Sequence, residues 1–265
     1  MLKLIAQNKY KLMVCIIGLY LFTDVLLHKG QARVLFGKTF PAAAIAPGPP
    51  KSKSTVVIQH KEWKKGVNTN EQLKQLDITA SGFESDVYYD TVKKGFNVYH
   101  DEDKQTGQTL QALLDQYRQR KMTAAIWLDI KNLTVDNATQ ALASLLELRK
   151  DYGLQNKLFV ESGLASLLTP FSDSGFYTIY YVPVFNPYQV SDSELKSWAD
   201  SIASVVHAAR INAVSGYYFQ TSFLQHYFPG YPVLTWAEKK PFSIVNTVFR
   251  NKIAADPAIT IVLYP

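Results

Sequence analysis

Most of the chain follows one pattern: short, continuous apolar runs alternate with stretches that have helical spacing. Continuous apolar runs between helices are typical of parallel strands whose sheet is covered on both faces. Eight such runs in about 210 residues fit an α/β fold of the (β/α)8 TIM-barrel type, and a doubly wound open sheet is the alternative. The predicted barrel strands are residues 56–60, 83–89, 124–131, 157–162, 176–184, 213–219, 231–236 and 258–264.

Helical segments separate most of these strands. Residues 191–211 begin with Ser191 and Glu194, which form a capping-box pattern, and residues 137–153 close on Gly153. A ninth strand, residues 96–100, is predicted to form a hairpin with the second barrel strand. The predicted helices are residues 70–76, 109–121, 137–153, 191–211 and 241–255.

The N-terminal segment is a candidate membrane anchor. An apolar run, residues 12–27, follows three lysines and is interrupted by Asp24. The lysines favour an uncleaved signal anchor with its N-terminus in the cytoplasm, and a cleaved signal peptide is the alternative. We therefore expect an anchor at residues 1–30, a Pro- and Ala-rich linker at 31–54 and the barrel at 55–265. The barrel would lie outside the cytoplasm, in the periplasm of a Gram-negative cell, or be secreted after cleavage.

The net charge of +6 is unevenly distributed. Residues 1–65 hold 11 Lys and Arg but only 2 Asp and Glu, whereas the remainder is slightly acidic. A nucleic-acid partner would require a basic patch within the fold, so we expect none. A basic arm beside an apolar run suits an anionic lipid surface. The single cysteine, Cys15, excludes an internal disulfide or a cysteine zinc site. The oligomeric state stays open.

Polar residues gather where the predicted strands end. Glu84 and Asp86 are two residues apart and therefore face the same side of their strand, as do Asp129 and Lys131. In a barrel the carboxyl ends of the strands form one rim, and barrel active sites lie there. The candidate site residues are His60, Glu84, Asp86, His100, Asp129, Lys131, Glu161 and Trp236.

This set of residues suggests phosphoester chemistry. Three carboxylates close together require a cation, and an oxygen-rich site favours one Mg²⁺ or Ca²⁺ over zinc. Histidine titrates near neutral pH, so His60 and His100 are candidates for general acid and base. A metal ion and Lys131 can stabilise charge on a phosphoryl oxygen.

Several short motifs resemble the glycerophosphodiester phosphodiesterase family, whose barrels belong to the phospholipase C-like phosphodiesterases. That family has His-Arg after its first strand, a Pro-Glu-Asn-Thr-like helix start, and then Glu-x-Asp, His-Asp and Glu-x-Lys. The matching motifs here are Gln59-His60-Lys61, Val67-Asn68-Thr69-Asn70, Glu84-Ser85-Asp86, His100-Asp101, Asp129-Ile130-Lys131 and Leu234-Thr235-Trp236.

The resemblance implies a role for each residue. It assigns Glu84, Asp86 and Asp129 to the divalent metal, His60 and His100 to acid–base catalysis, and Lys131 to the phosphate; Glu161 and Trp236 are further candidates for substrate contact. The family cleaves an alcohol from a phosphodiester, often through attack by a neighbouring hydroxyl. We therefore expect glycerophosphodiesters or lysophospholipid head groups as substrates.

The motifs also depart from the family. Lys61 stands in place of Arg, the Pro-Glu pair is absent, and Asp129 stands in place of Glu. An Asp-x-Lys third strand is also similar to sphingomyelinase D-type phospholipases, which form a cyclic phosphate, and the menorin group is a weaker match. The alternative from another class is a membrane-anchored binding barrel that lacks turnover.

Overall fold

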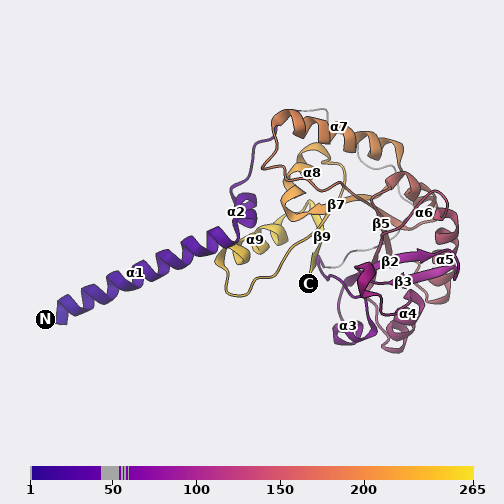
Figure 1. Ribbon diagram of the computed structural model, residues 1–265, viewed down its shortest axis with the longest axis horizontal. Helices are drawn as coiled ribbons and strands as arrows, with labels where there is room; N and C mark the ends of the chain where they lie inside the picture. The colour runs from indigo at the N-terminus through magenta and orange to yellow at the C-terminus, as the bar shows by residue number, and fades with distance from the viewer. Residues whose placement is uncertain (1, 43–53, 55, 57, 59) are drawn as a thin grey trace.

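The computed structural model describes all residues except 1, 43–53, 55, 57 and 59 (Figure 1). Within the described part, eight parallel strands form a barrel that closes between β1 and β2, which confirms the predicted (β/α)8 fold. A further strand, β3 (Gly95–Val98), pairs antiparallel with β2, as the sequence predicts. The barrel strands are β1 (Glu62–Lys64), β2 (Gly82–Asp90), β4 (Ala125–Ile130), β5 (Leu158–Ser162), β6 (Tyr177–Tyr181), β7 (Ala213–Tyr217), β8 (Val233–Trp236) and β9 (Ile259–Tyr264).

Helices surround the barrel, and the five predicted ones are all present. Side chains of Thr69, Thr109, Ser191 and Ser243 accept hydrogen bonds from backbone N–H groups in the first turns. The short α6 and α8 and three 3₁₀ helices were not predicted. The helices are α3 (Asn70–Gln75), α4 (Leu110–Gln119), α5 (Ala138–Asp151), α6 (Thr169–Asp173), α7 (Asp192–Ala208), α8 (Thr221–Tyr227) and α9 (Ile244–Ala255), with η1 (Glu102–Lys104), η2 (Ala165–Leu168) and η3 (Tyr218–Gln220).

The predicted first strand is wrong in its position. β1 begins at Glu62 rather than within residues 56–60, and it pairs with β9 from Glu62 to Lys64. Val56 and Ile58 lie outside any strand and pack against apolar side chains inside the barrel. Residues 57 and 59 of the predicted strand lie outside the described residues. Val56 and Ile58 therefore contribute to packing and not to sheet pairing.

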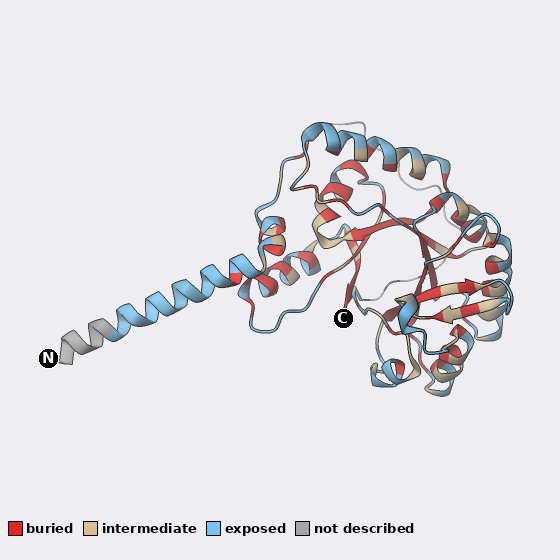
Figure 2. Cartoon of the chain, viewed as in Figure 1, coloured by how far each residue is buried: buried red, intermediate tan, exposed pale blue. Residues whose placement is uncertain are grey.

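Side chains that point into the barrel divide into two layers. Near the amino ends of the strands they are apolar and buried, and include Trp63, Trp127 and Phe159. Near the carboxyl ends they are polar, because Glu84, Asp86, Asp129 and Glu161 occupy the equivalent alternate positions. A second apolar core lies between the strands and the helices. Figure 2 shows the strands buried and the outer helices partly exposed.

The N-terminal region consists of an exposed helix and a packed one. Helix α1 (Leu2–Leu27) extends away from the barrel, and Lys9–Leu27 has the length and hydropathy, 1.8, of a membrane-crossing helix with 6% burial (Figures 1 and 2). Helix α2 (Lys29–Phe36) instead packs against α9, with Val34 buried. Phe40 is also buried. Residues 31–40 were predicted to be linker, and the structure shows them packed on the barrel.

Candidate active site

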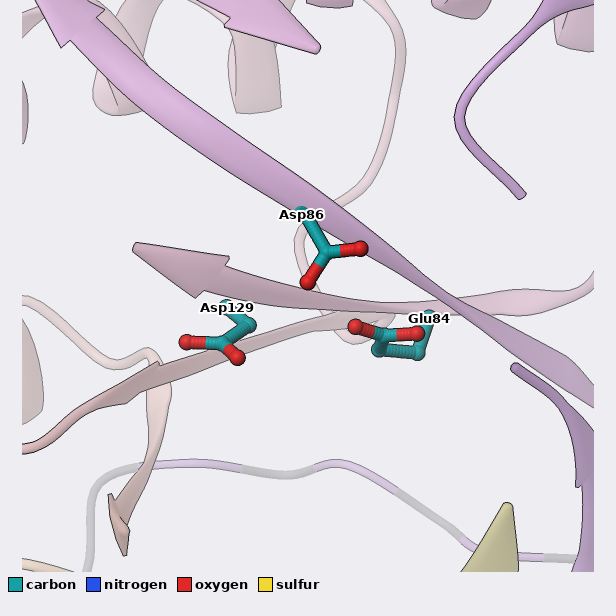
Figure 3. Close-up of side chains that lie close together, drawn as sticks. All are labelled: Glu84, Asp86 and Asp129. Carbon is teal, nitrogen blue, oxygen red and sulfur yellow. The ribbon is translucent and has the colours of Figure 1, made fainter. Parts of the chain in front are cut away.

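Three buried carboxylates from two neighbouring strands meet near the carboxyl ends of those strands. Glu84 and Asp86 lie on β2 and Asp129 on β4, where the sheet register pairs Asp86 with Asp129. One oxygen of each lies within 4.8 Å of the others, and Figure 3 shows the three side chains converging. Their exposed fractions are 2%, 1% and 8%. The two-residue spacing read from the sequence therefore brings these carboxylates together.

The segment after β1 holds two of these carboxylates in place. The backbone N–H of Gly66 donates to Glu84 Oε2 at 2.7 Å. Asn68 makes two bonds with Asp86: its Nδ2 donates to Oδ2 at 2.7 Å, and its Oδ1 accepts from the Asp86 N–H at 2.9 Å. Gly66 has a φ of +69°, which suits glycine. The turn after β1 thus orients the acidic cluster.

Lys131 neutralises part of this negative charge. Its Nζ lies 2.8 Å from Asp86 Oδ1 and also forms an ion pair with Asp129 Oδ2. The Lys131 side chain is 25% exposed. Burial lowers the pKa of the ammonium, but the carboxylates of Asp129 and Asp86 outweigh this effect and raise the pKa above its usual value. Lys131 therefore remains charged at neutral pH.

Two carboxyl groups of the cluster, those of Glu84 and Asp129, have raised pKa values. Burial raises the pKa of Glu84 to about 8, with a further contribution from Asp86 and Asp129. Burial also raises the pKa of Asp129, although Lys131 opposes the rise. Desolvation disfavours an isolated anion, and close like charges disfavour it further. Both effects therefore favour the protonated forms of Glu84 and Asp129.

Glu161 on β5 lines the same cavity, and the sheet register pairs it with Asp129. Trp127 Nε1 donates to its Oε2 at 3.1 Å, and the Ser215 hydroxyl donates to its Oε1. Burial raises its pKa well above the usual value, and Asp129 raises it further. Both carboxyl oxygens of Glu161 therefore already accept hydrogen bonds from protein groups.

The carboxylates line a small cavity of about 80 Å³ that adjoins a wider groove of about 750 Å³. Lys65, Asp86 and His100 line both, so the groove leads to the acidic cluster. The groove carries three lysines, Lys64, Lys65 and Lys104, and three aspartates, Asp77, Asp86 and Asp101. Of the predicted site residues, those lining the cavity are Glu84, Asp86, His100, Asp129, Lys131, Glu161 and Trp236.

An aromatic wall forms the side of the cavity that β6, β7 and β8 provide. The ring of Trp236 lies 5.3 Å from that of Tyr181 and 4.8 Å from that of Tyr217, measured between centroids. Lys65 Nζ lies 5.2 Å from the Trp236 ring centroid, a cation–π contact. Trp236 was predicted from the sequence as a site residue, whereas Lys65, Tyr181 and Tyr217 were not. Every second residue along β6 and β7 faces the barrel interior, and this alternation would have identified both tyrosines.

His100 lies just beyond β3, at the edge shared by the groove and the cavity. Its Nδ1 is 2.6 Å from Asp101 Oδ1, and its side chain is 57% exposed. If Nδ1 carries a proton, it donates to Asp101, and Nε2 is then the acceptor. Asp101 also forms an ion pair with Lys104 at 2.5 Å. The predicted His-Asp pair is thus a contact in the structure.

His60 does not join the other predicted residues. It lies two residues before β1, at the amino end of the barrel, and its backbone carbonyl accepts a hydrogen bond from Trp63 Nε1 at 2.9 Å. The neighbouring Lys61 donates to the carbonyl of Asp256, in the segment before β9. The prediction that His60 ends the first strand is wrong, because the true β1 starts later. The residues at the carboxyl end of β1 are Lys64 and Lys65.

Comparisons with known proteins agree with this geometry at the level of the fold. No protein-family model matches the chain, and no curated protein matches it. Among solved structures, a glycerophosphodiester phosphodiesterase from Parabacteroides distasonis is 14% identical over 78% of this chain and 94% of its own, with a TM-score of 0.51. A phosphodiesterase from Oleispira antarctica, solved with the product sn-glycerol-3-phosphate, is also 14% identical with a TM-score of 0.51, over 77% of this chain and 92% of its own. The chain therefore has the TIM-barrel fold found in these phosphodiesterases.

Proposed function

We propose that this protein is a metal-dependent phosphodiesterase that cleaves glycerophosphodiesters or the head groups of lysophospholipids. The observation that carries the proposal is the cluster of Glu84, Asp86 and Asp129, bound to Lys131 and open to a groove that His100 borders. The cluster lies at the carboxyl ends of barrel strands, where catalytic groups of this fold are found. The fold shared with known phosphodiesterases adds support.

The donor set fits one divalent cation. Lys131 compensates for one of the three clustered negative charges, so two remain when all three carboxyl groups are ionised. Oxygen ligands suit Mg²⁺ or Ca²⁺, and burial together with the charges of Asp86 and Asp129 raises the pKa of Glu84, which a bound cation would offset. When bound, such an ion would stabilise negative charge on the phosphoryl oxygens. Glu84, Asp86 and Asp129 would hold it.

Two ammonium groups and one imidazole would act on the phosphodiester. Lys131 faces the carboxylates, whereas Lys65 contacts an aromatic ring and has no ion pair among the described residues, so its charge is available to a phosphate. His100 would take a proton from the attacking water or hydroxyl and return one to the departing alcohol oxygen. One P–O bond forms, another breaks, and the protein gains no net proton. His60 is too poorly placed for this step, and Lys65 occupies the end of β1 instead.

A binding barrel without turnover is the second candidate. The observation that favours it is the single imidazole in the cavity, since His100 is the only histidine among its described lining residues. A binding barrel would retain a phosphate ligand through Lys65 and Lys131 without cleaving it.

A cyclic phosphate product, as from sphingomyelinase D-type enzymes, would instead identify attack by a substrate hydroxyl.

The test is ³¹P NMR of the full chain with glycerophosphocholine, lysophosphatidylcholine and sphingomyelin. We expect turnover that requires Mg²⁺ or Ca²⁺, stops in EDTA, and is lost in Lys65→Met and His100→Ala. His60→Ala is the matched control and should keep its activity. Loss of activity in His60→Ala alone would contradict the assignment of Lys65. Absence of turnover from a folded chain that binds metal would favour the binding barrel.

We also propose that the N-terminal segment is retained as a membrane anchor with the barrel outside the cytoplasm. Cleavage within residues 42–46 would remove α2 and Phe40 and expose the side chains they cover, including Phe249 and Ile253. Burial of that surface favours retention, since exposure of apolar area is unfavourable. The mass of the mature protein tests this: a mass matching a chain that begins after residue 42 would exclude the anchor.

A further inference from the structure

The end of α1 is fixed to the start of α9. Asp24, which interrupts the apolar run, is 5% exposed, and its Oδ2 accepts a hydrogen bond from the Val245 N–H at 2.9 Å. Its Oδ1 lies 2.9 Å from His28 Nδ1. The carboxylate thus binds the N-terminus of α9, where partial positive charge is available. An ionised group near the end of a membrane helix needs such partners.

The loop before α9 extends further along α1. The Tyr20 hydroxyl donates to the backbone carbonyl of Phe242, one helical turn before Asp24. Lys9–Leu27 contains 19 residues, or about 28 Å at 1.5 Å per residue. A hydrocarbon core is about 30 Å thick, so the whole segment is needed to cross it. Tyr20 lies within this segment and is therefore below the membrane surface. Phe242, whose carbonyl accepts the Tyr20 hydrogen bond, lies at a similar depth.

The residues at this level expose apolar side chains. Phe242 is 94% exposed and has a φ of +62°, a strained value for a bulky residue. Ile244 and Val248, one turn apart on α9, are each 49% exposed. Lys29 and Arg33 on α2 are exposed nearby, and neither has an ion-pair partner among the described residues. Exposed apolar side chains beside cations are suited to the interfacial region of an anionic bilayer, where the apolar groups can enter the lipid and the cations can contact the head groups.

We propose that Phe242, Ile244 and Val248 insert into the bilayer surface beside α1 and dock the barrel there. The continuity of this surface with the candidate membrane helix, through the Tyr20 and Asp24 contacts, identifies lipid as its occupant. The loop of residues 237–243 leads directly from Trp236, so the aromatic wall of the cavity is the side nearest the lipid. If the proposed phosphodiesterase function also holds, its substrate is a phospholipid or lysophospholipid of the same membrane.

Depth-dependent fluorescence quenching tests the docking without any assay of activity. The full chain carrying Phe242→Trp is reconstituted into phosphatidylcholine–phosphatidylglycerol vesicles that contain acyl-chain-brominated lipid. Val135→Trp is the matched control, because Val135 is an equally apolar residue, 80% exposed, in the loop after β4. The unsubstituted chain supplies the background from the four native tryptophans.

Bromolipid should quench the Phe242→Trp signal at least about twofold more than the Val135→Trp signal, because only the first position reaches the acyl region. Equal quenching at both positions, or none at position 242, would overturn the proposal. Failure of the phosphodiesterase assay would leave this result unaffected, so the two proposals fail separately. Phe242→Asp in the same vesicles should make Lys29 and Arg33 more accessible to trypsin, and unchanged cleavage would also count against docking.

Discussion

The amino-end and carboxyl-end halves of the barrel interior are built from the same strands but differ in chemistry. In the amino-end half Trp63, Phe159 and Ile179 pack into a closed apolar layer. Two residues further along each strand, the carboxyl-end half contains Glu84, Asp129 and other ionisable groups. Trp127 links the halves, since its ring belongs to the apolar layer and its Nε1 donates to Glu161.

This difference shows how the barrel separates stability from function. Burial of apolar side chains in the amino-end half stabilises the fold. The carboxyl-end half buries several carboxyl groups close together, and burial with the neighbouring charges of Asp86 and Asp129 makes ionisation of Glu84 unfavourable, as its raised pKa indicates. Substitutions in the amino-end half should therefore lower the free energy of unfolding. Substitutions in the carboxyl-end half should lower activity without lowering stability.

The largest effect on stability is expected for Phe159→Ala in the apolar layer. Phe159 is fully buried and contacts Trp63 with ring centroids 5.0 Å apart. Such truncations cost about 3–5 kcal/mol of unfolding free energy. Urea denaturation measures the loss, and the exposed Val135→Ala serves as a control that should change little. A small loss at Phe159 would mean that the layer contributes little to stability.

A similarly large effect, but on catalysis alone, is expected for Asp86→Asn. Loss of one charged group of the proposed metal site should lower kcat/KM for the proposed reaction by about 10²–10³-fold, as removal of a transition-state-stabilising group does. The metal-free melting temperature should not fall, because one of three crowded negative charges is removed. Asp136→Asn, an exposed site in the loop after β4, is the control. A parallel drop in stability would assign Asp86 a structural role.

Divalent metal should stabilise the folded chain by a smaller, pH-dependent amount. Mg²⁺ or Ca²⁺ at 100 times its Kd would add about 2.7 kcal/mol if it binds only the folded state. Burial raises the pKa of Glu84 in the folded state to about 8, from 4.5 for an exposed carboxyl group, so the metal-free folded state holds an extra proton between these pH values. Stability without metal therefore falls as pH rises through this window, and the metal effect grows.

Differential scanning fluorimetry at pH 5.5 and pH 8, with metal and with EDTA, measures both trends. Glu84→Gln should reduce the pH dependence of the metal-free chain, and the raised pKa values of Asp129 and Glu161 should account for the remainder. Melting temperatures in EDTA that rise from pH 5.5 to pH 8 would contradict the assigned pKa shift.

The smallest effect is expected for Gly82→Ala at the amino end of β2. An added Cβ would meet the Trp63 ring at 2.3 Å, so the indole would have to move. Overpacking of this kind costs about 1–3 kcal/mol. Gly95→Ala is the control, since its nearest contact would be an ordinary 4.0 Å. Chemical denaturation compares the two, and equal effects would mean that the Trp63 ring adjusts freely.

Parts of this architecture could be predicted because they depend on local periodicity. The two-residue repeat places Glu84 with Asp86, and Asp129 with Lys131, on the inner face of any barrel that contains these strands. The Ser191–Glu194 capping box also depends on a few adjacent residues, and both of its hydrogen bonds are present. The N-terminal apolar run likewise predicted α1 without reference to the rest of the chain.

Other parts could not be predicted because they depend on distant partners. The run at 56–60 has strand-like composition, but the residues that pair with β9 are Glu62–Lys64. His60 therefore lies at the amino end of the barrel, away from the acidic cluster, and Lys65 lines the cavity in its place. Asp24 interrupts the apolar run, and no pattern in the sequence accounts for a charge there. In the structure its carboxylate accepts a hydrogen bond from the Val245 N–H at the start of α9. The sequence alone determined the alternation of helices and strands and which side chains share a face. The tertiary structure decided which end of β1 meets the acidic cluster and what the N-terminal helix binds, because sheet register and helix docking are set by contacts between residues far apart in the chain.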